Sequence, residues 1–202
     1  MSDKRASSIQ STGLLRFCAL VGFLGALGLI GTILIAPLFV PDYNWIADTI
    51  SDLGAGEHEI IVDIGLYTYA AALLCLSVGA AHMHPGGRGW SIGILTLLVL
   101  AALIIVVGAR NEYGDNDNEG VVIHIYLVYG LGAGFAIAPF AMAQGPMRRV
   151  FYALGALWII TAPVFFFMPD GWDGLYERGL GLIALSWSSC LALMLWRAGD
   201  AR

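Results

Sequence analysis

Charged residues are scarce in this chain of 202 residues: only 12% are Asp, Glu, Lys or Arg, whereas 58% are hydrophobic. Soluble globular domains carry about 25% charged residues. A chain this apolar has too little polar surface to cover an exterior that faces water. The scarcity of charge therefore excludes an ordinary soluble domain and predicts a protein embedded in lipid.

Cysteine motifs are also missing. The three cysteines, Cys18, Cys75 and Cys190, lie far apart in apolar runs, and no CxxC or Cys/His cluster is present. A zinc ribbon and a dithiol redox centre are therefore excluded, and we expect the cysteines to act as small packing residues. No HExxH or P-loop motif occurs. There is no basic patch, so nucleic acid is not an expected partner.

Six apolar runs are long enough to cross a bilayer. A hydrocarbon core of about 30 Å requires about 20 apolar residues in a helix, and an isolated strand would leave backbone groups unpaired in lipid. The predicted spans are about 14–40, 62–83, 90–108, 121–143, 150–168 and 175–197. We therefore predict an all-α bundle, with one six-helix transmembrane domain at 14–197 between cytoplasmic tails at 1–13 and 198–202.

The bases and acids are segregated between the two ends of these spans. One end holds Lys4, Arg5, Arg16, Arg88, Arg148, Arg149, Arg197 and Arg202, and the other holds only Arg110 and Arg178. Short loops rich in Lys and Arg face the cytoplasm, so we predict that both termini are cytoplasmic. All acids except Asp3 and Asp200 lie at the outer end. These acids either fill positions from which bases are excluded or attract cations to the outer face.

Glycines recur at helical spacing in two spans. The first span contains Gly22, Gly25, Gly28 and Gly31 at intervals of three, and the fourth contains Gly130 and Gly134. Small residues let helix backbones approach closely in lipid, where the hydrophobic effect does not drive helix association. These glycines therefore predict tightly packed helix pairs.

The first outer loop contains an amphipathic segment. Residues 44–53 are predicted to form a short interfacial helix that stops at Gly54, with Ile46, Ile50 and Leu53 on one face. Asp48, Ser51 and Asp52 would share the opposite face. Three interpretations of that polar face remain open: simple hydration, tethering of neighbouring helix ends, or cation binding and acid–base chemistry.

The same loop carries a family resemblance. Residues 48–54, DTISDLG, follow a glycine-rich first span and resemble the first-loop signature of the Domain of Unknown Function 998 family of six-span prokaryotic membrane proteins. His124 and the pair Glu177–Arg178 belong to the same resemblance. The ISDxG cluster is also similar to the first loop of the eukaryotic DRAM/Frag/Sfk group. The resemblance implies a multi-pass architecture in a prokaryotic plasma membrane and no established activity.

Histidines and acids of the outer loops are candidate metal ligands. His58 and His124 could converge with outer carboxylates, as in the zinc hydrolases related to ceramidase and the adiponectin receptors, but spans five and six contain no histidine. Asp115, Asp117 and Glu119 imitate the first positions of a calcium loop, yet Tyr126 stands where that loop needs Glu. We therefore predict no metal and no cofactor.

The favoured function is a non-catalytic six-helix bundle that engages membrane lipids, a protein partner or a second copy through an acidic outer cap. The cap residues are expected to be Asp48, Ser51, Asp52, Gly54, His124, Glu177 and Arg178, with Arg178 paired to Asp48 or Asp52. The alternative is a lipid- or amide-directed hydrolase that uses Asp48, Ser51, Asp52 and His124 as catalytic residues. A small permease is the second alternative, although no acid lies at the centre of a span.

Overall fold

The computed structural model describes residues 11–55, 58–109, 123–169 and 171–200, and every regular element in these residues is a helix. The predicted all-α fold is therefore confirmed. The six long helices are α1 Thr12–Ile35, α3 Ile60–Met83, α4 Arg88–Ala109, α5 His124–Ala141, α6 Arg148–Thr161 and α7 Asp173–Asp200. The short elements are α2 Ile50–Gly54 and the 3-10 turns η1 Ala36–Leu38, η2 Gly145–Met147 and η3 Ala162–Phe167.

Each long helix is long and apolar enough to cross a membrane. The candidate spans are Thr12–Leu38, Ile60–Met83, Arg88–Ala109, His124–Ala141, Gly145–Phe167 and Asp173–Asp200. They match the six predicted runs to within a few residues at most boundaries. Large apolar side chains such as Leu27, Leu95 and Leu182 are more than half exposed on the bundle exterior. Such an exterior is that of a multi-pass membrane protein, because lipid covers it.

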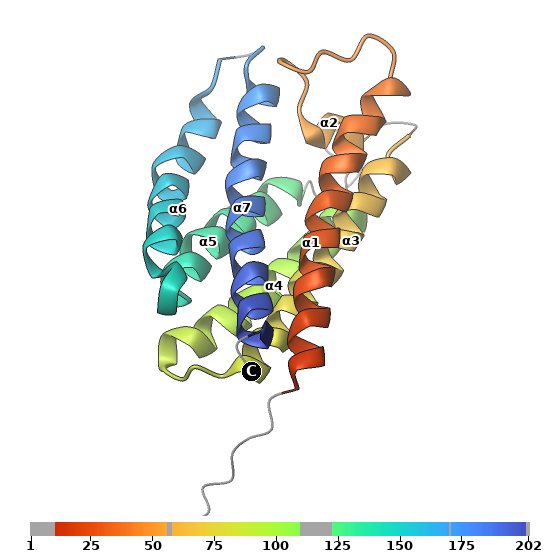
Figure 1. The fold of residues 1–202 in the computed structure, drawn as a ribbon. Helices are drawn as coiled ribbons and strands as arrows, with labels where there is room; N and C mark the ends of the chain where they lie inside the picture. Colours follow the sequence, from red (N-terminus) through yellow and green to blue (C-terminus); the bar gives the residue numbers. More distant parts are fainter. Residues whose placement is uncertain (1–10, 56–57, 110–122, 170, 201–202) are drawn as a thin grey trace, which may run out of the picture.

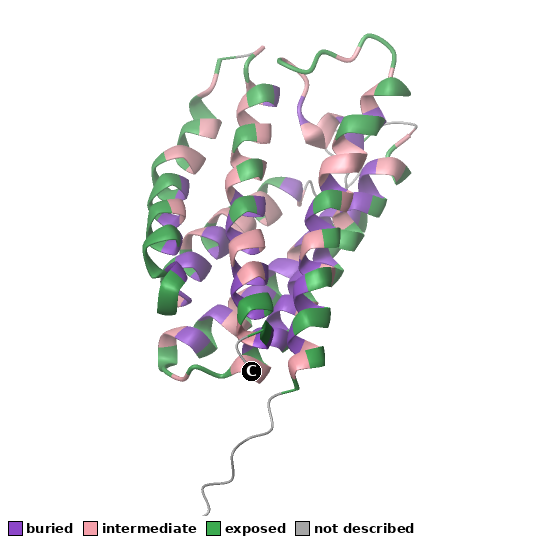
Figure 2. Ribbon diagram, viewed as in Figure 1, coloured by how far each residue is buried: buried purple, intermediate pink, exposed green. Residues whose placement is uncertain are grey.

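The helices pack in a ring around a shared core. α1 contacts both α3 and α7, and the chain then runs through neighbouring pairs α3–α4, α4–α5, α5–α6 and α6–α7 (Figure 1). The start of α1 and the end of α7 lie at the same end of the bundle (Figure 1). There, Arg16 Nη2 lies 2.5 Å from Asp200 Oδ1 in an exposed ion pair. Buried residues gather where the helices face one another (Figure 2).

Small residues allow the closest helix contact, between α1 and α3. A Cβ atom added to Gly25 would lie 2.4 Å from Ala72 Cβ and 2.7 Å from the Thr68 carbonyl oxygen. Gly22 and Gly28 also face side chains of α3, but a Cβ at Gly31 would meet no atom of the described residues. The predicted glycine contact is therefore present for three of the four positions in α1.

The short helix in the first outer loop differs from its prediction. It begins at Ile50 instead of residue 44, because Thr49 has an extended backbone and caps the helix. Thr49 Oγ1 accepts a hydrogen bond from the Asp52 amide at 3.1 Å, and Asp52 Oδ2 accepts one from the Thr49 amide at 2.6 Å. This reciprocal capping box fixes the first turn. Asp48 therefore precedes the helix, and the prediction that it shares a helical face with Ser51 and Asp52 is wrong.

Candidate functional site

The outer cap, defined here as residues 42–54, crosses from the end of α1 to α2 at the end of the bundle opposite the start of α1 and the end of α7 (Figure 1). Its first part is a turn closed by two side chains. Asn44 Oδ1 accepts from the Ile46 amide at 3.0 Å, and Asp48 Oδ2 accepts from the Asn44 amide at 2.7 Å. The Asp48 carboxylate therefore stabilises its own turn.

Arg178, on the second turn of α7, holds the backbone of this turn. Its Nη1 donates hydrogen bonds to the carbonyl oxygens of Asp48 at 2.9 Å and Gly174 at 2.8 Å. Its Nη2 donates to the Tyr43 hydroxyl. The guanidinium carbon also lies 4.8 Å from the centre of the Trp45 ring. A planar guanidinium suits this role, because it donates in two directions while stacking on an aromatic face.

The predicted ion pair of Arg178 with Asp48 or Asp52 is wrong for the described structure. Arg178 contacts the carbonyl oxygen of Asp48 instead of its carboxylate. The two carboxylates accept hydrogen bonds from the Asn44 and Thr49 amides, within their own loop. The acids satisfy the donors of the loop, and Arg178 satisfies its acceptors.

Tyr43 completes the same contact. Its hydroxyl lies 2.9 Å from the Asp48 carbonyl oxygen and 2.8 Å from that of Thr49, and it can donate to either. Burial raises the pKa of the Tyr43 phenol. The hydroxyl therefore keeps the proton that it needs in order to donate while it accepts from Arg178.

The start of α7 approaches the cap closely because residue 174 is glycine. A Cβ atom on Gly174 would lie 2.1 Å from the Asp48 carbonyl oxygen. The Leu175 amide, one residue later, donates to the Ile46 carbonyl oxygen at 3.0 Å. Any side chain larger than hydrogen at residue 174 would push the cap away from α7.

Arg178 is one clasp between α7 and the cap, and Glu177 is a second clasp, which joins α7 to α2. Glu177 Oε2 accepts a hydrogen bond from the Ile50 amide at 2.5 Å, and Glu177 Oε1 lies 3.5 Å from Ser51 Oγ. Ile50 is the first residue of α2, and its amide has no acceptor within the helix. The half-buried Glu177 carboxylate therefore fixes the position at which α2 begins.

Ser51, His124 and Glu177 meet at this point from three different helices. Ser51 Oγ lies 3.2 Å from Nε2 of His124, which is buried at the start of α5. A serine hydroxyl that contacts an imidazole is the first element of a nucleophilic site. In a Ser–His–acid triad the carboxylate orients the histidine, whereas Glu177 contacts Ser51 and the Ile50 amide. Its contacts suit an anchor for α2.

The remaining predicted residues lie elsewhere. Gly54 is buried at the end of α2, and the His58 ring lies 6.0 Å from the Phe39 ring. Asp115, Asp117 and Glu119 fall outside the described residues. Within the described residues, no group of three or more His, Cys, Asp and Glu side chains is arranged to hold a metal ion.

Three structural residues of the cap were missed from the sequence. The role of Thr49 could have been predicted, because the sequence Thr-x-x-Asp before an apolar residue resembles a capping box. The sequence signal for Tyr43 and Trp45 is weaker: they are aromatic residues beside acids in an outer loop, and the outer end of the spans has few arginines with which they could stack.

One motif match lies outside the cap. Ser91 is the central residue of GWSIG, residues 89–93, which matches the pattern GxSxG. A nucleophile elbow needs a strand-to-helix turn, whereas Ser91 is exposed within α4.

Comparison with known proteins places this architecture in a family. A family model described as a protein of unknown function, DUF998, matches residues 23–194. The chain belongs to the DUF998 family. The matched range contains the complete outer cap together with His124, Glu177 and Arg178, so the resemblance carried by the ISDLG cluster is confirmed.

No curated protein and no solved structure matches the chain significantly. Membership of DUF998 therefore assigns no activity, substrate or partner. The similarity of the first loop to the DRAM/Frag/Sfk group stays a prediction.

Proposed function

We propose that this DUF998 protein is a non-catalytic membrane protein whose outer cap presents a rigid acidic and aromatic surface to lipid headgroups. Two clasps from α7 support this proposal. Arg178 holds the carbonyl oxygens of the first turn, and Glu177 holds the first amide of α2. Because these two ionisable groups bind the cap backbone, they act as structural anchors of the surface.

The exposed side of the cap indicates the kind of headgroup. Asp42, Trp45 and Ile46 are exposed, and so is Glu59 beside the cap at the start of α3. The cap contains three acids and no base. Carboxylates and an indole ring at a membrane boundary attract ammonium groups. We therefore propose that the surface favours lipids with an ammonium headgroup over lipids whose headgroup is only anionic.

The proposal includes an orientation. The arginine-rich end of the bundle would face the cytoplasm and the cap the opposite side, in a prokaryotic plasma membrane. The distribution of Lys and Arg supports the orientation.

Lipid retention tests the headgroup preference. The purified protein would be mixed with equal amounts of phosphatidylethanolamine and phosphatidylglycerol carrying the same chains, and bound lipid counted by native mass spectrometry. We expect Asp42→Asn/Glu59→Gln to lower retention of the ethanolamine lipid without changing the melting temperature. Asp200→Asn, which removes an acid from the other end, serves as control. Equal ethanolamine-lipid retention by the double variant and the wild type would contradict the proposal.

The Ser51–His124 contact favours one alternative, a hydrolase that acts on a lipid ester or amide. A fluorophosphonate probe that modifies activated serines distinguishes the two functions. The structural function predicts no modification of Ser51, because Glu177 and His124 only position its hydroxyl. Modification of Ser51 that disappears in His124→Gln would instead establish an activated nucleophile.

A further inference from the structure

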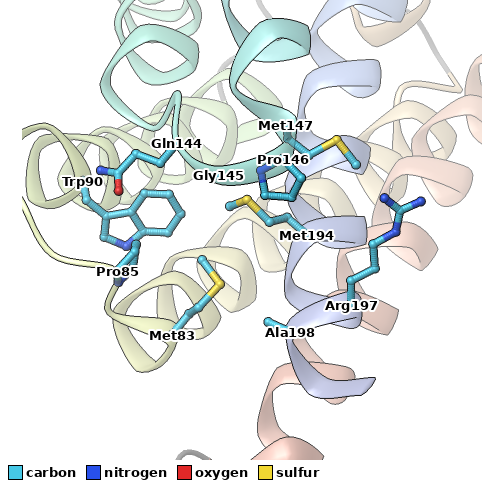
Figure 3. A pocket seen from close by; sticks show the side chains of 10 residues that line it. All are labelled: Met83, Pro85, Trp90, Gln144, Gly145, Pro146, Met147, Met194, Arg197 and Ala198. Carbon is cyan, nitrogen blue, oxygen red and sulfur yellow. The ribbon is translucent and has the colours of Figure 1, made fainter. Parts of the chain in front are cut away.

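We propose that a cleft at the arginine-rich end of the bundle binds one anionic phospholipid of the adjacent leaflet. The cleft has a volume of about 350 Å³ and lies between the end of α3, the start of α4, η2 and the end of α7 (Figure 3). Its lining includes Met83, Trp90, Pro146, Met147, Met194 and Arg197. It shares no residue with the outer cap, so the inference is independent of the function proposed for the cap.

The walls of the cleft are fixed by packing and hydrogen bonds. Trp90 is buried, and its Nε1 donates to the Ala80 carbonyl oxygen at 2.9 Å. The Gln144 side chain donates to the Gly86 carbonyl oxygen at 3.2 Å and ties the loop before η2 to the loop after α3. Methionine side chains complete the apolar lining, and their flexible thioethers adapt to irregular hydrocarbon.

The position of the cleft selects a lipid over a water-soluble ligand. α3 ends at Met83, α4 begins at Arg88 and α7 ends at Asp200, so the cleft lies at the ends of three spanning helices. At this depth the hydrocarbon of a bilayer gives way to its headgroups. A volume of this size is near the lower limit for ligand pockets. It suits the upper part of one acyl chain and the adjoining ester groups.

Charge then selects an anionic headgroup. The described residues at this end include the arginines Arg16, Arg88, Arg148, Arg149 and Arg197. The acid Asp200 is paired with Arg16 at 2.5 Å. Arg197 is exposed on the cleft lining, and among the described residues no carboxylate forms an ion pair with it. A lipid phosphate in the cleft mouth would meet this guanidinium.

Titration of the full-length protein with matched lipids tests the site. Phosphatidylglycerol and diacylglycerol with identical chains, neither of which carries the ammonium group proposed for the outer cap, would be added to the protein in detergent, and bound lipid measured by native mass spectrometry. We expect preferential retention of phosphatidylglycerol. Arg197→Gln should weaken it about fivefold, as expected for one arginine near an anionic headgroup.

Two further variants separate the cleft from general surface charge. Arg149→Gln removes an exposed arginine that does not line the cleft, so it should leave retention nearly unchanged. Ala198→Leu should weaken retention of both lipids by filling the cleft while Arg197 stays in place. Equal losses in Arg149→Gln and Arg197→Gln would overturn the site, and so would equal retention of the two lipids by the wild type. If the protein retains free oleate but does not retain phosphatidylglycerol, the assignment of the cleft to a phospholipid is overturned.

Discussion

Three acids at the outer cap each accept a hydrogen bond from a backbone amide of the first outer loop. Asp48 accepts from Asn44, Asp52 from Thr49 and Glu177 from Ile50. Arg178 and Tyr43 supply the complementary donors to the loop carbonyl oxygens. The sequence indicated the importance of these ionisable residues. It did not show that they bind backbone groups, because an acid opposite a base suggests an ion pair equally well.

Glu177→Ala tests the anchor at the start of α2. The substitution leaves the half-buried Ile50 amide without its acceptor, which costs about 1–3 kcal/mol. We expect a clear drop in melting temperature, measured in detergent. The matched change Glu59→Ala removes an exposed acid near the same loop and should alter stability by no more than about 0.5 kcal/mol. Equal effects of the two substitutions would show that the Glu177 contact contributes nothing.

At the scale of helices, hydropathy predicts most of the fold. A spanning helix needs a long apolar run, and that requirement is local in sequence, so the six spans appear close to their predicted bounds. The short α2 follows a different rule. Its start depends on one capping box at Thr49, which outweighed the helical spacing of Ile46, Ile50 and Leu53. A local cap therefore shortened a helix that periodicity alone extended to residue 44.

Gly25 and Gly31 offer a matched pair for the packing of α1 against α3. A methyl group at residue 25 would overlap Ala72 and the Thr68 carbonyl oxygen, whereas one at residue 31 would meet no described atom. We expect Gly25→Ala to lower the melting temperature in detergent and Gly31→Ala to leave it unchanged. If both variants melt like the wild type, the contact between α1 and α3 is not as close as the structure describes.

At the scale of the whole molecule, the outer cap links the first loop to the last helix. Ile50 and Glu177 are separated by 127 positions, and Asp48 and Arg178 by 130. No local pattern predicts which loop meets which helix across such distances. The resemblance to DUF998 named Ser51, His124 and Glu177 together, but only the packing of the long helices brings the three side chains into contact.

Cysteine labelling tests the orientation of the whole chain. With the native cysteines replaced by alanine, single cysteines would be placed at the exposed positions Ala55, beside the cap, and Pro146, at the opposite end. A membrane-impermeant maleimide added to intact cells should modify residue 55 and spare residue 146. Modification of residue 146 alone would reverse the orientation proposed from the arginine distribution.

Hydrogen exchange in lipid nanodiscs tests most directly whether α7 holds the cap as a rigid structure. The amides of Ile50, Asp52 and Leu175 are bonded to Glu177, Thr49 and Ile46, so they should exchange far more slowly than amides of a free peptide. Glu177→Ala should accelerate exchange in residues 43–54 while the amides in the middle of α3 stay protected. Exchange of the wild-type cap at the rate of a free peptide would contradict the account.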